Sequence, residues 1–328
     1  MILVTGGLGY VGSHCVKLLL ESGRDVVILD NLLYGHTEAS CGAPYVIGDM
    51  ENTDRIRQIL RDYPVDAVMH FAAFAAVGES MGNPQMYFDN NVRNGLNLLQ
   101  ACLEAGIQRF IFSSTAATFG EPVEVPITEE HPQSPTNPYG ESKLFFEKVL
   151  KWYDQAYGLK SVSLRYFNAA GAHPSGEIGE DHEPERHLIP LVLGAAQGVR
   201  PALTVFGDDY NTPDGTCVRD YVHVSDLASA HLLALEQLES GKGSGAYNLG
   251  NGNGYSVLEV IGKAEEITGL KVPYSVGPRR PGDPARLVAS SQKAKTELGW
   301  KPEFRSLENI IETAWRWHKN HPKGYKSV

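Results

Sequence analysis

Short apolar runs alternate with stretches of helical periodicity through the first half of the chain. The apolar runs are the length of strands and lack the polar alternation of a half-exposed sheet, which is typical of parallel strands buried on both faces. They lie at residues 2–5, 26–29, 45–47, 67–71 and 110–112, and residues 161–165 are predicted to form another strand. Helical spacing predicts helices at residues 11–20, 53–60, 91–105 and 139–153. This alternation predicts an α/β fold with a doubly wound, parallel Rossmann sheet.

The pattern changes after residue 168. Residues 171–186 are rich in Gly, Pro, His and Glu, which predicts a loop, and the elements that follow are shorter. We interpret residues 1–168 as the larger domain and residues 169–328 as a smaller, mixed α/β lobe. Apolar strands at 222–224 and 246–249 are expected to return to the large sheet, so that the segment near 217–250 belongs with the first domain.

Composition narrows the class of protein. The 328 residues are 42% hydrophobic and carry a formal net charge of −10. The apolar share supports a folded core, and the acidity disfavours a nucleic-acid partner, whose phosphates require cations. The four cysteines, Cys15, Cys41, Cys102 and Cys217, form no Cys-x-x-Cys pair. We therefore expect no metal site, no disulfide scaffold and a reducing compartment.

The first residues of the chain do not have the pattern of a secretory signal peptide. Met1 leads directly into an apolar run without a basic segment or a small-residue cleavage site. No apolar run approaches the roughly 18 residues that a membrane span needs. We expect a cytoplasmic protein with no membrane partner.

A glycine-rich turn follows the first predicted strand. Gly6, Gly9 and Gly12 stand between this strand and the helix at 11–20, where backbone N–H groups can approach a pyrophosphate closely. A glycine turn alone could be a plain tight turn. Asp30 ends the second strand, 18 residues after Gly12, where a carboxylate can accept hydrogen bonds from adenosine ribose hydroxyls. The same carboxylate repels a 2′-phosphate and so favours NAD over NADP, and Asp49 could lie near the adenine.

A tyrosine and a lysine share one face of a predicted helix. Tyr139 and Lys143 are four residues apart, and a lysine cation beside the phenol would favour the phenolate. Tyr139 could then take a proton from a substrate hydroxyl. Residues 113–115, Ser-Ser-Thr, supply hydroxyls at the carboxyl end of a strand, where ligands bind in open α/β sheets. Taken singly, the pair could be a surface pair and the hydroxyls strand-end caps.

Together these motifs resemble the extended short-chain dehydrogenase/reductases, and within them the UDP-glucose 4-epimerase family, almost from end to end. Further matching segments are His70–Ala73, Val77–Ser80, Arg165–Asn168, Phe206–Tyr210, Asp214–Thr216 and Val218–Val224. The resemblance implies an NAD-binding Rossmann domain at 1–168 and a UDP-sugar-binding lobe at 169–328. It also implies an isomerase that binds NAD tightly. The sugar would be oxidised at C4, the 4-keto sugar would rotate, and hydride would return to its other face.

The resemblance assigns roles residue by residue. Thr115, Tyr139 and Lys143 would be catalytic, with Thr115 holding the 4-oxygen and Lys143 orienting the nicotinamide ribose and lowering the pKa of Tyr139. Cofactor-binding positions would be Gly6, Gly9, Tyr10, Val11, Gly12, Asp30, Asn31, Asp49, Met50, Phe71, Ala72, Ala73, Asn90, Ser113, Tyr139, Lys143 and Phe167. Substrate-binding positions would be Thr115, Asn168, His187, Leu188, Phe206, Arg219, Tyr221, Arg280, Asp283 and Leu287.

Some alternatives stay open. Ala116 and Ala117 follow Thr115 where related dehydratases or decarboxylases place an acid, so those activities are disfavoured. A non-catalytic NAD-sensing protein is disfavoured by the intact Thr115, Tyr139 and Lys143. A 4-epimerase of another UDP sugar (an N-acetylhexosamine, uronate or pentose) is the main alternative, because the shared chemistry fixes the reaction type more firmly than the substrate. The resemblance places Leu287 where side-chain bulk gates N-acetylated sugars. Relatives form homodimers through helices matching roughly 85–105 and 139–154. Candidate contacts are Leu96, Leu98, Leu99, Phe145, Phe146 and Val149.

Overall fold

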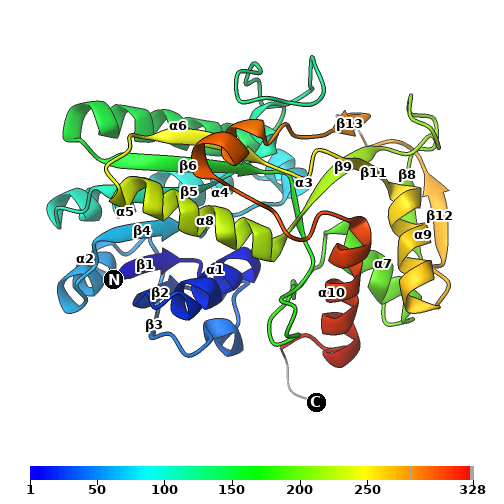
Figure 1. Cartoon of the computed structure of the whole chain (residues 1–328), viewed down its shortest axis with the longest axis horizontal. Coiled ribbons are helices and arrows are strands. Elements are labelled where there is room, and N and C mark those ends of the chain that lie inside the picture. Colours follow the sequence, from blue (N-terminus) through cyan, green and yellow to red (C-terminus); the bar gives the residue numbers. More distant parts are fainter. Residues whose placement is uncertain (281–282, 326–328) are drawn as a thin grey trace.

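The computed structural model describes residues 1–280 and 283–325 (Figure 1). Seven strands form the larger sheet in the order β10-β6-β5-β4-β1-β2-β3, and every neighbouring pair is parallel. The strands are β1 (Ile2–Thr5), β2 (Val26–Asp30), β3 (Tyr45–Ile47), β4 (Ala67–His70), β5 (Arg109–Thr115), β6 (Lys160–Tyr166) and β10 (Gly245–Leu249). The predicted doubly wound Rossmann sheet is confirmed.

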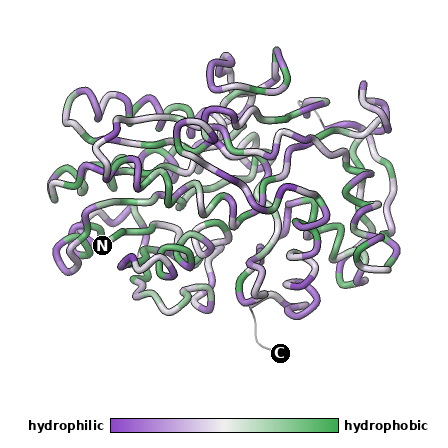
Figure 2. Tube along the Cα trace, in the orientation of Figure 1, coloured by the Kyte–Doolittle hydropathy of each residue, from purple (hydrophilic) through white to green (hydrophobic). Residues whose placement is uncertain are grey.

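Helices cover both faces of this sheet. Helices α1 (Tyr10–Glu21) and α8 (Val224–Glu239) pack on one face, and α2 (Thr53–Asp62), α5 (Asn94–Glu104) and α6 (Pro138–Tyr157) on the other (Figure 1). Strand side chains alternate between the two faces: Val4 packs in the cluster of α1 and α8, and Leu3 in that of α2, α5 and α6. Both faces of the central strands β1, β2 and β4 are therefore buried, which is why these three strands are mostly apolar (Figure 2).

The second half of the chain builds the smaller lobe. A four-stranded sheet contains β7 (Asn168–Ala170), β9 (Val218–His223), β11 (Gly254–Ser256) and β13 (Arg286–Leu287), and β8 (Leu203–Phe206) pairs with β12 (Tyr274–Gly277). Helices α7 (Leu188–Ala196), α9 (Val257–Thr268) and α10 (Leu307–Asn320) share an apolar core with these strands. A mixed α/β lobe is the architecture that the sequence predicts.

One strand expected in the large sheet lies elsewhere. The segment 246–249 falls within β10, which pairs with β6. The segment 222–224 ends β9 and starts α8, and β9 pairs with β7, β11 and β13 in the smaller sheet. The prediction for 222–224 is wrong, because an apolar strand buried among neighbours has the same sequence pattern in either sheet. The division of domains at residue 168 stays a prediction.

Helices differ from their predicted bounds mainly at the start of the 91–105 segment. Here a π-helical turn (Asp89–Arg93) precedes α5, and the short helices α3 (Val77–Gly82) and α4 (Pro84–Phe88) lie before it. Single π turns occur often at functional sites. Shorter helical turns are Thr37–Ser40, Ala116–Thr118 and Ala294–Leu298. Among the residues that the structure describes, no helix is long and apolar enough to cross a membrane.

Candidate active site

The glycine turn lies where the strand order of the large sheet reverses. Strand β1 sits between β2 and β4, so successive connections leave it in opposite directions and open a crevice at the carboxyl ends of the strands. Gly6 has φ +71°, and a Cβ there would lie 2.6 Å from the backbone nitrogen of Ala72. A Cβ on Gly12 would lie 2.2 Å from the carbonyl oxygen of Gly6. Only glycine fits at these two positions, which leaves backbone exposed for a phosphate-bearing ligand.

Asp30 lies beside this turn at the end of β2. It is 7% exposed, and its carboxylate accepts hydrogen bonds from the backbone N–H of Leu8 (3.0 Å) and of Leu32 (2.9 Å). Burial raises the pKa of Asp30, and the two N–H donors lower it. The side-chain amide of Asn31 donates to Asp49 at 2.8 Å. The structure thus brings three predicted cofactor positions, Asp30, Asn31 and Asp49, to one edge of the crevice.

The segment after β4 forms the facing wall. The backbone N–H groups of Phe71 and Ala72 donate to the carbonyl of Thr5 at 2.9 and 3.1 Å, which holds this segment against the glycine turn. Asn90 donates to Asn91 within the π-helical turn at 3.0 Å. Asn91 in turn accepts from the backbone N–H of Phe74 and donates to Ser142 of α6 (2.9 and 3.1 Å). These hydrogen bonds of Asn91 were not predicted from the sequence, in which a polar residue on the inner face of the predicted helix was the only signal.

Tyr139 lies in the first turn of α6. Asn137 caps this helix by accepting a hydrogen bond from the N–H of Gly140 at 2.9 Å, and Pro138 starts it with a favourable φ. Burial raises the pKa of Tyr139, whereas the nearby Thr115 side chain lowers it. The structure therefore brings the two predicted catalytic side chains near each other, although they are 24 residues apart in the sequence.

Lys143 follows one turn later on the same helix and is buried. Its Nζ donates to the backbone carbonyl of Ser113 at 2.8 Å and lies 4.8 Å from the centre of the Phe112 ring. Burial lowers the pKa of Lys143 to about 7, while Glu147 raises it. Burial therefore acts on Lys143 as well as on Tyr139. The role of Lys143 in lowering the pKa of Tyr139 stays a prediction.

The residues 113–115 divide between two environments because side chains alternate along β5. Ser113 hydrogen-bonds the Tyr166 hydroxyl, and Thr115, on the same side, lies near Tyr139. Ser114 faces the other way and donates to Glu147 at 2.5 Å. Glu147 also pairs with Arg165, Nη2 to Oε2 at 2.6 Å, with side chains 9% and 7% exposed. This buried ion pair was not predicted, since its members are 18 residues apart.

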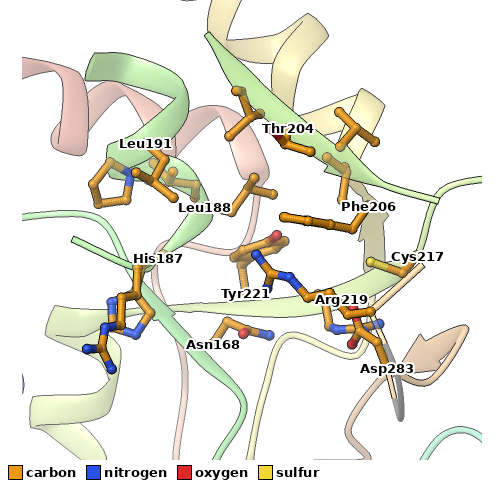
Figure 3. Close-up of a pocket in the computed structure, with 18 of the residues that line it drawn as sticks. Asn168, His187, Leu188, Leu191, Thr204, Phe206, Cys217, Arg219, Tyr221 and Asp283 are labelled. Atoms are coloured by element: carbon orange, nitrogen blue, oxygen red, sulfur yellow. The ribbon is translucent and has the colours of Figure 1, made fainter. Parts of the chain in front are cut away.

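A pocket of about 440 Å³ opens beside the smaller lobe (Figure 3). Most of the predicted substrate positions line it: Asn168, His187, Leu188, Phe206, Arg219, Tyr221, Arg280 and Asp283. Thr115 and Leu287 are not among its lining residues. The lining also includes Arg186, Arg200 and Cys217, which sequence analysis did not select.

Two arginines define the electrostatics of this pocket. Arg219 pairs with Asp283, and its other nitrogen donates to the Val218 carbonyl at 2.8 Å. The Arg280 guanidinium lies 4.0 Å from the centre of the Phe206 ring. Asn168 donates to the carbonyl of Asp220 at 2.9 Å. Guanidinium groups held in this way suit a phosphate-bearing ligand. Asp283 contributes to this pocket by forming an ion pair with Arg219.

Known proteins of similar sequence and structure have related names. The UDP-glucose 4-epimerase of Lacticaseibacillus casei is 54% identical over 325 residues, which cover 99% of this chain and 98% of that protein. The crystal structure of a UDP-glucose 4-epimerase from Bifidobacterium longum in complex with NAD+ and UDP is similar with a TM-score of 0.94 at 40% identity, covering 99% of both chains. A UDP-Glc/GlcNAc 4-epimerase from Campylobacter jejuni has a TM-score of 0.85 at 39% identity, covering 97% of this chain and 99% of that one.

The family match agrees with the site. The NAD dependent epimerase/dehydratase family matches residues 2–250, which include the glycine turn, Asp30, Thr115, Tyr139 and Lys143. This stretch is most of the chain and contains both walls of the crevice. The chain belongs to the NAD dependent epimerase/dehydratase family.

Proposed function

We propose that this chain is an NAD-dependent UDP-sugar 4-epimerase, an isomerase that interconverts UDP-glucose and UDP-galactose. One observation carries the proposal: the Tyr139 phenol lies near Thr115 at the crevice formed at the glycine turn, and an arginine-bearing pocket lies in the smaller lobe. Close similarity to named UDP-glucose 4-epimerases over almost the whole chain supports it.

The residues present fit NAD. Gly6 and Gly12 leave backbone accessible where a Cβ would clash, and Asp30 offers carboxylate oxygens beside them. Ser113 lies near the carboxyl end of β5, Phe71 directly follows β4, and Asn90 lies in the π-helical turn before α5. When bound, NAD supplies reversible acceptance and return of a hydride. Asp30 would select NAD by accepting from its ribose hydroxyls and repelling a 2′-phosphate.

The chain's own residues would manage the proton and the sugar. Tyr139 would accept the proton of the sugar 4-hydroxyl and return it after the hydride has been restored. Thr115 would hold the 4-oxygen, and it also lowers the pKa of Tyr139, which favours the phenolate that this role needs. Arg219 and Arg280 would bind the pyrophosphate in the pocket of about 440 Å³, and the hexose would extend from there to Tyr139 and Thr115, where it would turn over.

Two other activities are less well supported. Ala116 and Ala117, in the helical turn after Thr115, carry no proton-transfer group, which argues against a dehydratase or decarboxylase. A 4-epimerase of another UDP sugar is the stronger alternative, and the similarity to an enzyme named for both glucose and N-acetylglucosamine substrates favours testing it. Leu287 is outside the lining of the pocket, so its role in excluding an N-acetyl group stays a prediction.

The test is turnover without added reductant. Purified protein incubated with UDP-galactose should produce UDP-glucose, and a panel of UDP-N-acetylhexosamines, uronates and pentoses with product separation should rank the substrates. Protein that retains NAD but converts no UDP sugar would refute the proposal. A preferred N-acetylated sugar would keep the reaction and change the substrate.

The likeness to the family also supports a homodimer formed through α5 and α6. Of the six candidate contacts, Leu98, Leu99 and Phe146 are fully buried in this chain, so they cannot reach a partner. Phe145 is 46% exposed, and Trp152 on the same helix is 67% exposed. We propose that these two side chains, rather than the buried ones, contribute to the interface. Light scattering should give twice the chain mass, and Trp152→Glu should shift it toward the monomer.

A further inference from the structure

Two glutamates and two histidines meet in the loop between β7 and α7. Glu180, His182, Glu185 and His187 each contribute one nitrogen or oxygen atom to a cluster in which these atoms lie within 4.8 Å of one another. Glu180 is 3% exposed and Glu185 is 8% exposed. The cluster is therefore a set of potential metal ligands, of which the two carboxylates are buried.

The charges of this cluster are not balanced by lysine or arginine. His187 Nδ1 contacts Glu180 Oε1, and His182 Nδ1 lies 3.3 Å from the same oxygen. Among the residues that the structure describes, only these two histidines pair with Glu180 and Glu185. Two buried carboxylates with no permanently charged partner favour the binding of a cation.

The arrangement of Glu185 is independent evidence for a ligand. Its Oε1 accepts from the backbone N–H groups of Arg186 (2.7 Å) and His187 (2.8 Å), which fixes the orientation of the carboxylate. Its Oε2 faces His182 Nδ1 at 3.8 Å, which is too long for a hydrogen bond, and the side chain is only 2% exposed. Among the residues that the structure describes, this oxygen of the buried Glu185 side chain faces the cluster without a partner at hydrogen-bond distance.

The spacing suits a four-coordinate ion. Ligand bonds of about 2.0–2.2 Å in a tetrahedral zinc site put neighbouring ligand atoms about 3.4 Å apart. The separations that the structure gives between imidazole and carboxylate atoms include 3.3 and 3.8 Å, so small side-chain movements would complete the site. Imidazole and carboxylate together suit borderline divalent ions better than Ca²⁺ or Mg²⁺. We propose that Glu180, His182, Glu185 and His187 form a structural site for a divalent transition-metal ion, with Zn²⁺ as the expected occupant.

The surroundings indicate what such an ion would stabilise. The carbonyl of Glu180 accepts from the indole N–H of Trp317 in α10 at 3.0 Å, and the Tyr10 ring packs edge-on against His182 with centroids 6.1 Å apart. His187 is the N-cap of α7 and lines the pocket. The ion would therefore connect the glycine-turn helix, α10 and one wall of the pocket. All four ligands come from protein, which leaves no open position for catalysis.

The first experiment measures metal in the untagged full chain. Protein purified without chelators should contain about one zinc ion per chain by mass spectrometry. Removing it with a chelator should lower Tm by several degrees, and stoichiometric Zn²⁺ should restore it. Metal-free protein whose Tm does not respond to micromolar Zn²⁺ would overturn the proposal and identify the cluster as a histidine–glutamate ion pair. This readout is independent of turnover, so it separates the metal site from the proposed epimerase.

The second experiment uses matched variants. His182→Gln and Glu180→Gln should lose most of the bound metal, whereas Glu177→Gln should retain it. Glu177 lies in the same loop but is paired with Lys17 at 2.8 Å, outside the cluster. If the first two variants do not fold, Co²⁺ added to the chelated full chain decides the matter. Intense tetrahedral absorption bands support the site, and octahedral aqueous Co²⁺ spectra contradict it. Equal metal content in His182→Gln and in the unaltered chain would also contradict it.

Discussion

At the scale of single residues, Tyr139 is the group on which the chemistry depends. Replacing it with phenylalanine removes the proton acceptor but preserves the ring that lies edge-on to Tyr87, with centroids 6.4 Å apart. We expect Tyr139→Phe to lower kcat by about 10²- to 10⁴-fold, while NAD retention stays unchanged. Tyr157→Phe at the exposed end of the same helix is the control and should leave kcat unchanged. Full turnover by the Tyr139 variant would show that another group takes the proton.

The buried ion pair between Arg165 and Glu147 is expected to stabilise the fold. Both side chains are buried, and Glu147 accepts from Ser114 as well as from Arg165. Glu147→Gln leaves a buried guanidinium without its counter-charge, so we expect a loss of about 3–5 kcal/mol in the free energy of unfolding. Urea denaturation measures it. Glu141→Gln, an exposed acid on the same helix, should change stability by less than about 0.5 kcal/mol. Similar losses of unfolding free energy in Glu147→Gln and Glu141→Gln would mean that the buried Arg165–Glu147 pair does not stabilise the fold.

At the scale of elements, the N-terminus of α6 links local structure to the site. Asn137 lies two residues before Tyr139 and caps the helix by accepting a hydrogen bond from the N–H of Gly140. Asn137→Ala should lower the free energy of unfolding by about 1 kcal/mol and, by loosening the first turn, should also lower kcat. Asn137→Ser restores a capping oxygen and should recover most of both losses. If the alanine variant loses stability but retains kcat, the cap does not position Tyr139.

Some helices, strands and loops of this chain were predictable from the sequence, and others were not. The strand at 2–5 and the helix at 53–60 were predictable because apolar spacing and glycine punctuation are local signals. The π-helical turn Asp89–Arg93 was not predictable, since its hydrogen-bond pattern differs from an α-helix by one residue and its side chains show no distinct period. The loop at 171–186 was identified correctly, but the meeting of Glu180 with His187 inside it depends on how the loop folds back.

At the scale of the whole molecule, buried neutral histidines should control acid stability. Burial lowers the pKa of His14, His70 and His223 to about 3, and that of His231 to about 4. Below pH 6.5 the unfolded chain binds protons at these positions and the folded chain does not. Stability should therefore fall as pH decreases from 6.5 toward these values, by up to about 1.4 kcal/mol per pH unit for each histidine.

The contribution of one histidine can be isolated. His70→Leu removes a proton that would otherwise be taken up on unfolding, so the slope of unfolding free energy between pH 6.5 and 5 should decrease by up to about 1.4 kcal/mol per pH unit. The variant also loses the contact of His70 with the Thr5 hydroxyl (2.7 Å), which lowers stability at every pH. The slope, measured by urea denaturation at several pH values, is therefore the decisive quantity. Identical slopes would show that His70 is protonated in the folded chain.

The fold class, the glycine turn, Asp30 and the Tyr139–Lys143 pair were predictable from the amino-acid sequence, because each depends on residues that are near one another along the chain. The sheet that receives β9, the hydrogen bond of Lys143 to Ser113 and the contact of Ser114 with a buried ion pair are visible only in the three-dimensional structure. These outcomes depend on contacts between segments distant in sequence and on the burial they create. Burial sets the pKa values and the choice of partners, and no local pattern of residues encodes it.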